Sequence, residues 1–214
     1  HPTRRPYSGD SPRNRTAASG TGFVVSPGHV MTCAHVIEDM QELHIASFSG
    51  RYRAEVVVVD QRNDMALLRI QDCPPLTPVV FKDAVGCALG EPVIALGFPM
   101  AGLAGGGVHV TQGGVSGLFG LHNDASLLQF TAAIQPGSSG SPLFDSSGAV
   151  IGMVTSSLPA AQNMNFAVKA GLLLAFLHAC HVSPPKSPTV RVISTAEMAR
   201  EAQSSLWRIE ARNP

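Results

Sequence analysis

Three stretches that lie far apart in the chain hold the residue types that activate a serine hydroxyl. "GSSGSP" presents Ser139 between Gly137 and Gly140, and glycine allows the backbone bend that exposes a hydroxyl on a tight turn. "TCAHV" places His35 at the exit of an apolar strand, and "RNDMALLRI" places Asp64 directly before another. A serine hydroxyl is a poor nucleophile until a base removes its proton, and a histidine oriented by a carboxylate can be that base. The three residues therefore predict nucleophilic catalysis by Ser139, with His35 as base and Asp64 as its orienting acid.

The serine turn is also expected to bind the negative charge that such a reaction creates. Backbone N–H groups of Gly137 and Ser139 are the expected oxyanion hole, because they lie two residues apart on one turn. Apolar residues bracket the turn at 132–134 and 142–144, whereas a flexible Gly-Ser linker would lack such neighbours.

Metal binding and cysteine chemistry are the alternatives for the same region. His29, Cys33 and His35 are ligand types that zinc accepts, but they lack C-x2-C spacing, and His35 would have to abandon Ser139. The other cluster of such ligand types is "HACH", with His178, Cys180 and His181. Cys33 is a poor candidate nucleophile, since it precedes the expected base on the same strand and has no glycines beside it. We expect no metal site and no cofactor.

The elements that must position these residues are mainly short strands. From Gly20 onward, runs rich in Val, Ile, Phe and Thr alternate with breaks of Gly, Pro, Asn and Ser, which is typical of an all-β sandwich or barrel. A proline-rich break divides the strands into halves, which predicts two small barrels over about residues 20–75 and 85–170.

Helices are expected only toward the C-terminus. "AGLLLAFLHAC" predicts a helix over 170–181, with Leu173, Phe176, Leu177 and Cys180 on one face. Residues 183–214 are expected to be a linker and a helical extension, in which Ser194 and Glu197 have capping-box spacing and Met198, Ala202 and Ile209 form an apolar face. At the other end, residues 1–19 hold four arginines and three prolines and predict a flexible arm.

Composition excludes several classes of partner. The chain has 214 residues, and its 15 basic and 15 acidic side chains cancel, so nothing favours bulk attraction to nucleic acid or to an anionic membrane. No apolar run reaches the roughly 18 residues of a membrane-spanning helix. The four cysteines have no motif spacing and are expected to be unpaired, which favours an intracellular, reducing compartment.

Taken in order, "GTGFVVSPGHVMTCAHVIE", "RNDMALLRI" and "TAAIQPGSSGSPLFDSSGAVIGMVTSSL" with "NFAV" resemble the protease domain of the HtrA (Do-like) group of chymotrypsin-type serine peptidases, over about residues 20–178 of a domain spanning 20–182. The resemblance implies two six-stranded antiparallel barrels with the active site between them. It places His35, Asp64 and Ser139 on the family's base, acid and nucleophile, and it implies that Thr155 hydrogen-bonds Asp64. It also leaves the bacterial periplasm open as a location. We expect no PDZ module within residues 181–214, because the Gly-Leu-Gly-type sequences typical of one are absent there.

The same resemblance implies a primary substrate pocket and two departures from the family. The pocket is expected to include Ala133, Ile134, Gln135, Thr155, Ser156 and Phe166. The family commonly has Asn-Ser-Gly-Gly at the nucleophile, whereas this chain has Ser138, Ser139, Gly140 and Ser141, which bears on the loop geometry.

The expected function is therefore a serine endopeptidase that cuts polypeptides after small or medium apolar residues. The alternative is a latent or inactive protease-fold sensor module of a larger protein. Such a module would bind peptide strands along "VTSSL" and signal through the 194–210 segment. Further domains in the full-length chain are compatible with either function.

Overall fold

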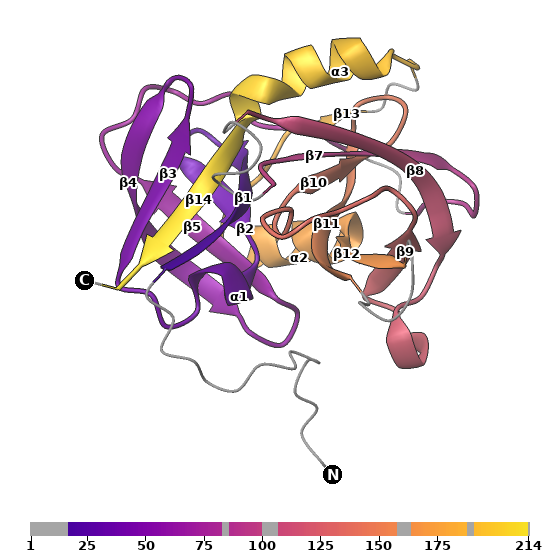
Figure 1. Ribbon diagram of the computed structural model, residues 1–214, viewed down its shortest axis with the longest axis horizontal. Helices are drawn as coiled ribbons and strands as arrows, with labels where there is room; N and C mark the ends of the chain where they lie inside the picture. The colour runs from indigo at the N-terminus through magenta and orange to yellow at the C-terminus, as the bar shows by residue number, and fades with distance from the viewer. Residues whose placement is uncertain (1–16, 83–85, 100–106, 158–163, 188–190, 214) are drawn as a thin grey trace.

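The strands form two six-stranded antiparallel barrels that lie side by side (Figure 1). This computed structural model describes residues 17–82, 86–99, 107–157, 164–187 and 191–213. The expected all-β fold of two barrels is confirmed. Within the described residues, no helix has the length and apolar character needed to cross a membrane.

The first barrel closes through strands taken from both ends of the chain. Its order around the barrel is β1-β14-β3-β4-β5-β2, and every neighbouring pair is antiparallel. The strands are β1 (Ala17–Ser26), β2 (His29–Thr32), β3 (Glu42–Ser47), β4 (Gly50–Asp60), β5 (Met65–Ile70) and β14 (Leu206–Arg212). The N-terminal part of the chain thus supplies five strands, and the sixth comes from the C-terminal segment.

The C-terminal segment differs from the expected helical extension. The helix α3 (Thr195–Ala202) begins at the expected cap, where the Ser194 hydroxyl accepts the Glu197 N–H, but it ends before β14. In β14 the sequence "LWRIEAR" alternates between buried and more exposed positions, which is the period of a strand. Trp207 is buried and meets the Tyr52 ring of β4 edge-on, with 5.7 Å between ring centroids. Ile209 therefore belongs to the barrel core and not to a helix face.

The other end of the first barrel also extends beyond the expected boundary. Ala17, Ala18 and Ser19 were expected in the N-terminal arm, but they begin β1 and pair with residues 210–212 of β14. Residues 1–16, the rest of that arm, lie outside the described residues.

The second barrel is closed by the pairing of β10 with β11. Its order is β10-β7-β8-β9-β12-β11. In addition, β6 pairs in parallel with β11, and β13 pairs in parallel with β6. These strands are β6 (Phe81–Lys82), β7 (Pro92–Gly97), β8 (His109–Gly117), β9 (Leu127–Phe130), β10 (Pro142–Phe144), β11 (Val150–Ser157), β12 (Asn165–Lys169) and β13 (Lys186–Ser187).

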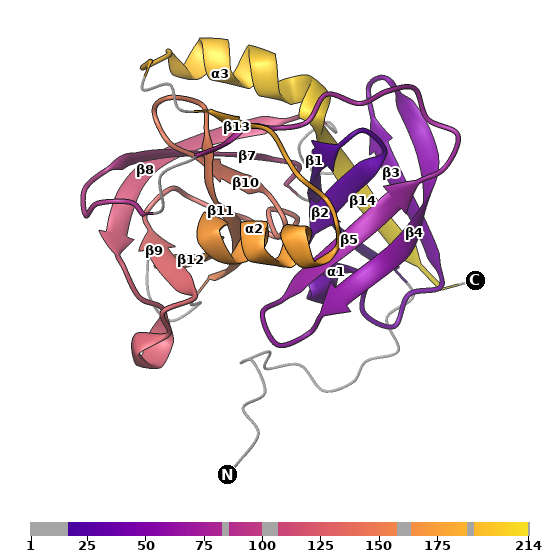
Figure 2. The same cartoon turned by 180° about the vertical axis from the view of Figure 1, so that it is seen from behind.

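Helices cover the outside of the barrels and do not enter them. The helix α2 (Ala170–Ala179) follows β12 directly (Figure 2). It buries Leu173 and Leu177 completely, as the sequence pattern predicts. A single turn, α1 (Ala34–Ile37), leaves the first barrel after β2. Two 3₁₀ turns complete the described elements, at Leu121–Asn123 and Gln203–Ser205.

Because β14 is a strand of the closed barrel, its core residues should control the stability of the protein. Ile209→Ala removes a side chain that is 0% exposed and should lower the free energy of unfolding by about 2–5 kcal/mol in chemical denaturation. Arg212→Ala on the same strand removes an exposed ion pair with Glu42, so it should cost far less than Ile209→Ala. Equal effects of the two variants would show that β14 is not part of the cooperative core.

Candidate active site

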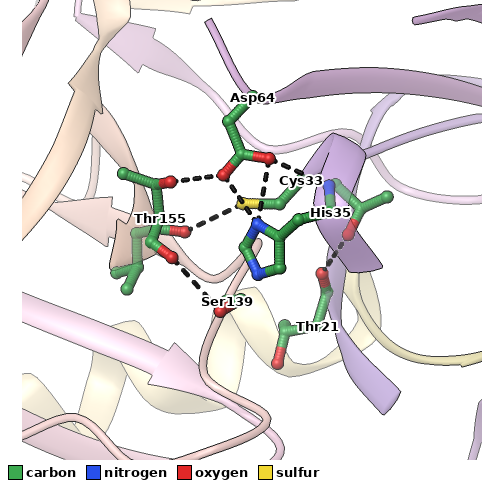
Figure 3. A network of polar contacts seen from close by, with 8 residues as sticks. Thr21, Cys33, His35, Asp64, Ser139 and Thr155 are labelled. Carbon is green, nitrogen blue, oxygen red and sulfur yellow. Dashed lines mark hydrogen bonds and ion pairs between the residues drawn. The ribbon is translucent and has the colours of Figure 1, made fainter. Parts of the chain in front are cut away.

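Four side chains from the two barrels meet in one cluster of polar contacts (Figure 3). His35 lies in α1, just after β2, and Asp64 lies in the turn before β5, so both belong to the first barrel. Ser139 lies in the loop before β10, and Thr155 lies on β11, so both belong to the second. The structure thus brings together the three residues that the sequence analysis selected, with Thr155 beside them.

The backbone of Asp64 adopts a conformation that few residues tolerate. Its φ is 56°, in the left-handed region, where Asp and Asn are the common non-glycine residues. Upstream in the same turn, the Asp60 carboxylate accepts hydrogen bonds from the Asn63 N–H at 3.1 Å and from its side-chain amide at 2.6 Å. Asp60 and Asn63 therefore order the turn that presents Asp64. The sequence analysis missed Asp60, although an Asp three residues before an Asn at a strand end is a turn signal.

The Asp64 carboxylate accepts hydrogen bonds from both barrels. Its Oδ1 accepts the backbone N–H of His35 at 2.9 Å, and the ring nitrogen Nδ1 of His35 lies 2.8 Å from Oδ2. The hydroxyl of Thr155 donates to the same Oδ2, as the resemblance implied. Burial alone would raise the pKa of Asp64, but the hydrogen bonds from His35 and Thr155 outweigh burial and hold the pKa below its ordinary value. Asp64 is therefore ionised at neutral pH.

The contact with Asp64 fixes which His35 nitrogen is available for other chemistry. With Nδ1 bound to the carboxylate, Nε2 is the remaining ring nitrogen, and the side chain is 42% exposed. Among the described residues, Ser139 forms no hydrogen bond with the His35 ring. Its hydroxyl donates instead to the carbonyl oxygen of Thr155, 3.2 Å away.

The loop before β10 begins with a tight turn. Gln135 to Ser138 form a turn of type II, with Pro136 second, Gly137 third at φ 96° and the Ser138 N–H donating to the Gln135 carbonyl at 2.9 Å. The Ser138 hydroxyl accepts the Gln135 N–H at 3.1 Å and so reinforces the turn.

The next two N–H groups that bond within the fold are those of Gly140, which donates to Val154, and Ser141, which donates to Ser138. From Gln135 to Ser141 in the described structure, the N–H groups of Gly137 and Ser139 alone donate to no protein acceptor. They are the two groups expected to form an oxyanion hole.

Ser141, which stands where the family commonly has glycine, packs into the protein and not beside Ser139. It is 1% exposed, and its hydroxyl has no hydrogen-bond partner among the described residues. Its side chain faces Gly97 at the end of β7, where a Cβ would collide with the Ser141 hydroxyl and lie 2.9 Å from the Thr21 hydroxyl. The missing side chain at position 97 therefore makes room for the extra one at position 141.

The residues expected to form a substrate pocket come from neighbouring segments. β11 and β12 are paired, with Ser156 opposite Phe166, so two of the three expected walls adjoin. Phe166 is 2% exposed, but it does not pack into either of the two clusters of buried apolar side chains that form the core, whereas Ala167 and Val168 do. Ala133 and Gln135 are exposed, and Ile134 is half-buried. The side chain of Ser156 lies outside what the structure describes.

Two of the three residues first considered as metal ligands, Cys33 and His35, lie close together. Among the described residues, their potential ligand atoms and those of Asp64 come within 4.8 Å of one another, whereas His29 is outside this group and pairs with the Ser26 hydroxyl at 2.9 Å. Burial raises the pKa of the Cys33 thiol well above its ordinary range, and the Asp64 carboxylate raises it further. The Cys33 thiol donates to the Val154 carbonyl at 3.2 Å. A protonated, fully buried thiol is a poor metal ligand and a poor nucleophile.

Known proteins resemble this chain in sequence and in fold. A family model described as a trypsin-like peptidase domain matches residues 20–153. An uncharacterized protein, y4bJ, of Sinorhizobium fredii is 37% identical over 95% of this chain and 35% of its own length. The mitochondrial serine protease HTRA2 of Bos taurus is 34% identical over 82% of this chain and 38% of its own. The chain thus spans little more than a third of these curated relatives.

Solved structures show the same likeness. The active form of the Rv3671c protease from M. tuberculosis superposes with a TM-score of 0.65 and 28% sequence identity, over 78% of this chain and 75% of that one.

The contact between Gly97 and Ser141 predicts a specific pattern of stabilities. Ser141→Ala removes a buried hydroxyl that has no partner, so the free energy of unfolding should rise by about 1 kcal/mol. Gly97→Ala should lower it by about 1–3 kcal/mol through overpacking, and by less when Ser141→Ala is also present. Denaturant unfolding of the four proteins measures this coupling. Additive effects would mean that the two positions do not touch.

Proposed function

The chain belongs to the trypsin-like peptidase family, with HtrA-type serine proteases among its relatives, and from this membership we propose that it is a serine endopeptidase that uses Ser139, His35 and Asp64. The observation that carries the proposal is the pair of unpartnered N–H groups, on Gly137 and Ser139, in the loop that faces the His35–Asp64 pair. A loop that served only as a connection would have little reason to leave these two groups unbonded, because its other N–H groups find acceptors.

In the proposed reaction, the Ser139 Oγ attacks the carbonyl carbon of a peptide bond while its proton passes to Nε2 of His35. The oxygen of that carbonyl becomes negative and accepts hydrogen bonds from the N–H groups of Gly137 and Ser139. His35 then gives the proton to the leaving amine as the C–N bond breaks, and water hydrolyses the acyl-enzyme by the same steps. Asp64 holds the ring tautomer with its proton on Nδ1 and stabilises the imidazolium.

The position of the Ser139 hydroxyl favours a second candidate function, a latent protease-fold module. The hydroxyl donates to Thr155, so attack requires it to turn toward His35. A half-exposed side chain exchanges rotamers rapidly, and catalytic hydrogen bonds in free enzymes are often unformed until substrate binds. The resting contact is therefore compatible with an active enzyme, and the reactivity of Ser139 distinguishes the two functions.

A fluorophosphonate probe should label the protein at Ser139, and the protein should hydrolyse an unfolded substrate such as reduced casein. Ser139→Ala should abolish labelling and lower kcat by about 10³-fold or more, while the free energy of unfolding changes little. Ser147→Ala is the matched control, since its hydroxyl serves only a turn with Asp145. An intact fold that the probe does not label would favour the latent module, and a Ser139→Ala variant within tenfold of the parent would identify another nucleophile.

The expected pocket walls carry no charged side chain, which bears on the substrate. Segments 133–135, 155–157 and 165–167 contain neither acid nor base. Asn165 is 5% exposed, and its amide donates to the Ala132 carbonyl at 2.8 Å, so its polar end is already bonded. A lysine or arginine head bound there would lose its hydration without a charged partner, at a cost of several kcal/mol.

Cleavage should therefore follow Val, Ala, Leu or Thr and should be poor after Lys or Arg. Buried apolar side chains contribute about 0.8 kcal/mol per methylene, and Phe166 should shorten the pocket against Phe and Trp. Mass spectrometry of peptides from a denatured proteome digested by the protein gives the residue before each cut, with Ser139→Ala as the blank. A dominance of basic residues at that position would contradict the pocket assignment.

A further inference from the structure

We propose that Thr21 of β1 is a positioning residue, whose hydroxyl holds the loop of Ser139 so that the N–H groups of Gly137 and Ser139 remain free for the substrate oxygen. The inference rests on the proposed function, and it concerns a residue that the sequence analysis passed over. The only local signal is a polar residue between two glycines in "GTGFVV".

Thr21, which lies near Ser139 in Figure 3, is 0% exposed and uses every polar group that it has. Its N–H donates to the Ser139 carbonyl at 2.8 Å, and its hydroxyl donates to the Gly137 carbonyl at 2.9 Å. The same hydroxyl accepts the Phe98 N–H at 2.9 Å. Its own carbonyl accepts the Thr32 hydroxyl at 2.7 Å. One residue of the first barrel thus bonds two carbonyls of the loop and a backbone group that follows β7.

These bonds act on the two peptide units that flank the Ser138–Ser139 unit. The Gly137–Ser138 unit is held at its carbonyl by Thr21 and at its N–H by Gln135. The unit between Ser139 and Gly140 is held at its carbonyl by Thr21 and at its N–H by Val154.

A peptide unit is planar, so bonds at both ends fix its orientation, and only the dihedrals between units remain. With both neighbouring units fixed, the Ser139 N–H has little freedom to turn away from the Gly137 N–H.

The contact between β1 and the loop is also too close to slip. A Cβ on Gly140 would collide with the Thr21 carbonyl, and a Cβ on Gly20 would lie 3.1 Å from the Ser139 carbonyl and 2.7 Å from Val36. The loop therefore lies directly on the backbone of β1. A methyl group in place of the Thr21 hydroxyl would fill the same space but would leave the Gly137 carbonyl and the Phe98 N–H unpaired.

The test compares Thr21→Val, which keeps the shape and loses the hydroxyl, with Thr21→Ser, which keeps the hydroxyl. Loss of one oxyanion-hole donor costs about 10²–10³ in kcat, so loosening both donors through Thr21→Val should lower kcat by about tenfold to a hundredfold. KM should stay within about threefold, because the affected bonds form to the charged oxygen and not to the ground-state peptide. The rate of fluorophosphonate labelling should fall with kcat, and Thr21→Ser should restore both to within about threefold.

Thr195→Val is the matched control. It makes the same exchange at a threonine of α3 whose hydroxyl donates to the Gln112 side chain and not to the loop, so kcat should stay within about threefold of the parent. Near-ultraviolet circular dichroism and thermal melting show whether each variant is folded. If Thr21→Val does not fold, Thr21→Cys replaces it, because a thiol is a weaker donor and acceptor and should still give a lower kcat than Thr21→Ser.

Three results overturn the inference. One is a folded Thr21→Val, or Thr21→Cys where that replaces it, with the kcat of Thr21→Ser. Another is an equal loss of kcat in Thr21→Val and Thr195→Val, which would indicate a nonspecific effect of the exchange. The third is a loss confined to KM. A parent protein that the probe never labels would instead overturn the proposed function itself.

Discussion

The arrangement of the site depends on one partly buried negative charge, the carboxylate of Asp64. A carboxylate withdrawn from water is costly unless donors surround it, and Asp64 finds them on both barrels: the His35 backbone and ring from the first, and the Thr155 hydroxyl from the second. The carboxylate therefore has all of these hydrogen-bond donors only when the two barrels are packed against each other. The same contacts set the orientation of the His35 ring and place the Thr155 carbonyl within reach of Ser139. The same hydrogen bonds thus compensate the burial of the carboxylate and fix the geometry of the site.

Much of the site could be predicted from the sequence, because each of the three candidate catalytic residues lies at the end of a strand or in a turn. His35 follows an apolar run, Asp64 precedes one, and Ser139 lies in a glycine-rich turn, and these are local patterns. The two-barrel fold is visible for the same reason, since strands and turns alternate at short spacing. Local patterns do not show which distant residue a side chain will bond. Thr21 bonds Gly137, which is 116 residues away and which the sequence does not mark, whereas Asp60 bonds Asn63 only three residues away and was simply overlooked.

The C-terminal strand was missed for a related reason. Met198, Ala202 and Ile209 fall at helical spacing, and the first two do lie in α3, so the pattern was extended one element too far. The decisive interaction for residues 206–212 is pairing with β1 and β3, and neither strand is near in the sequence. Likewise, the two unbonded N–H groups of the serine loop remain because the other N–H groups donate to Val154 of β11 or to acceptors within the loop itself. A glycine locates such a turn but does not say which N–H groups remain free.

Because β14 is a strand of the first barrel, this barrel can close only late in the synthesis of the chain. A ribosome releases β1 first and β14 last among the described strands, yet the two are neighbours in the finished barrel. A nascent chain therefore holds five strands with open edges on β1 and β3 until residue 212 has emerged. Thr21 lies on β1, in register with Arg208 of β14. The strand that contacts the loop of Ser139 therefore gains its last neighbour only when the last of the described strands has been made.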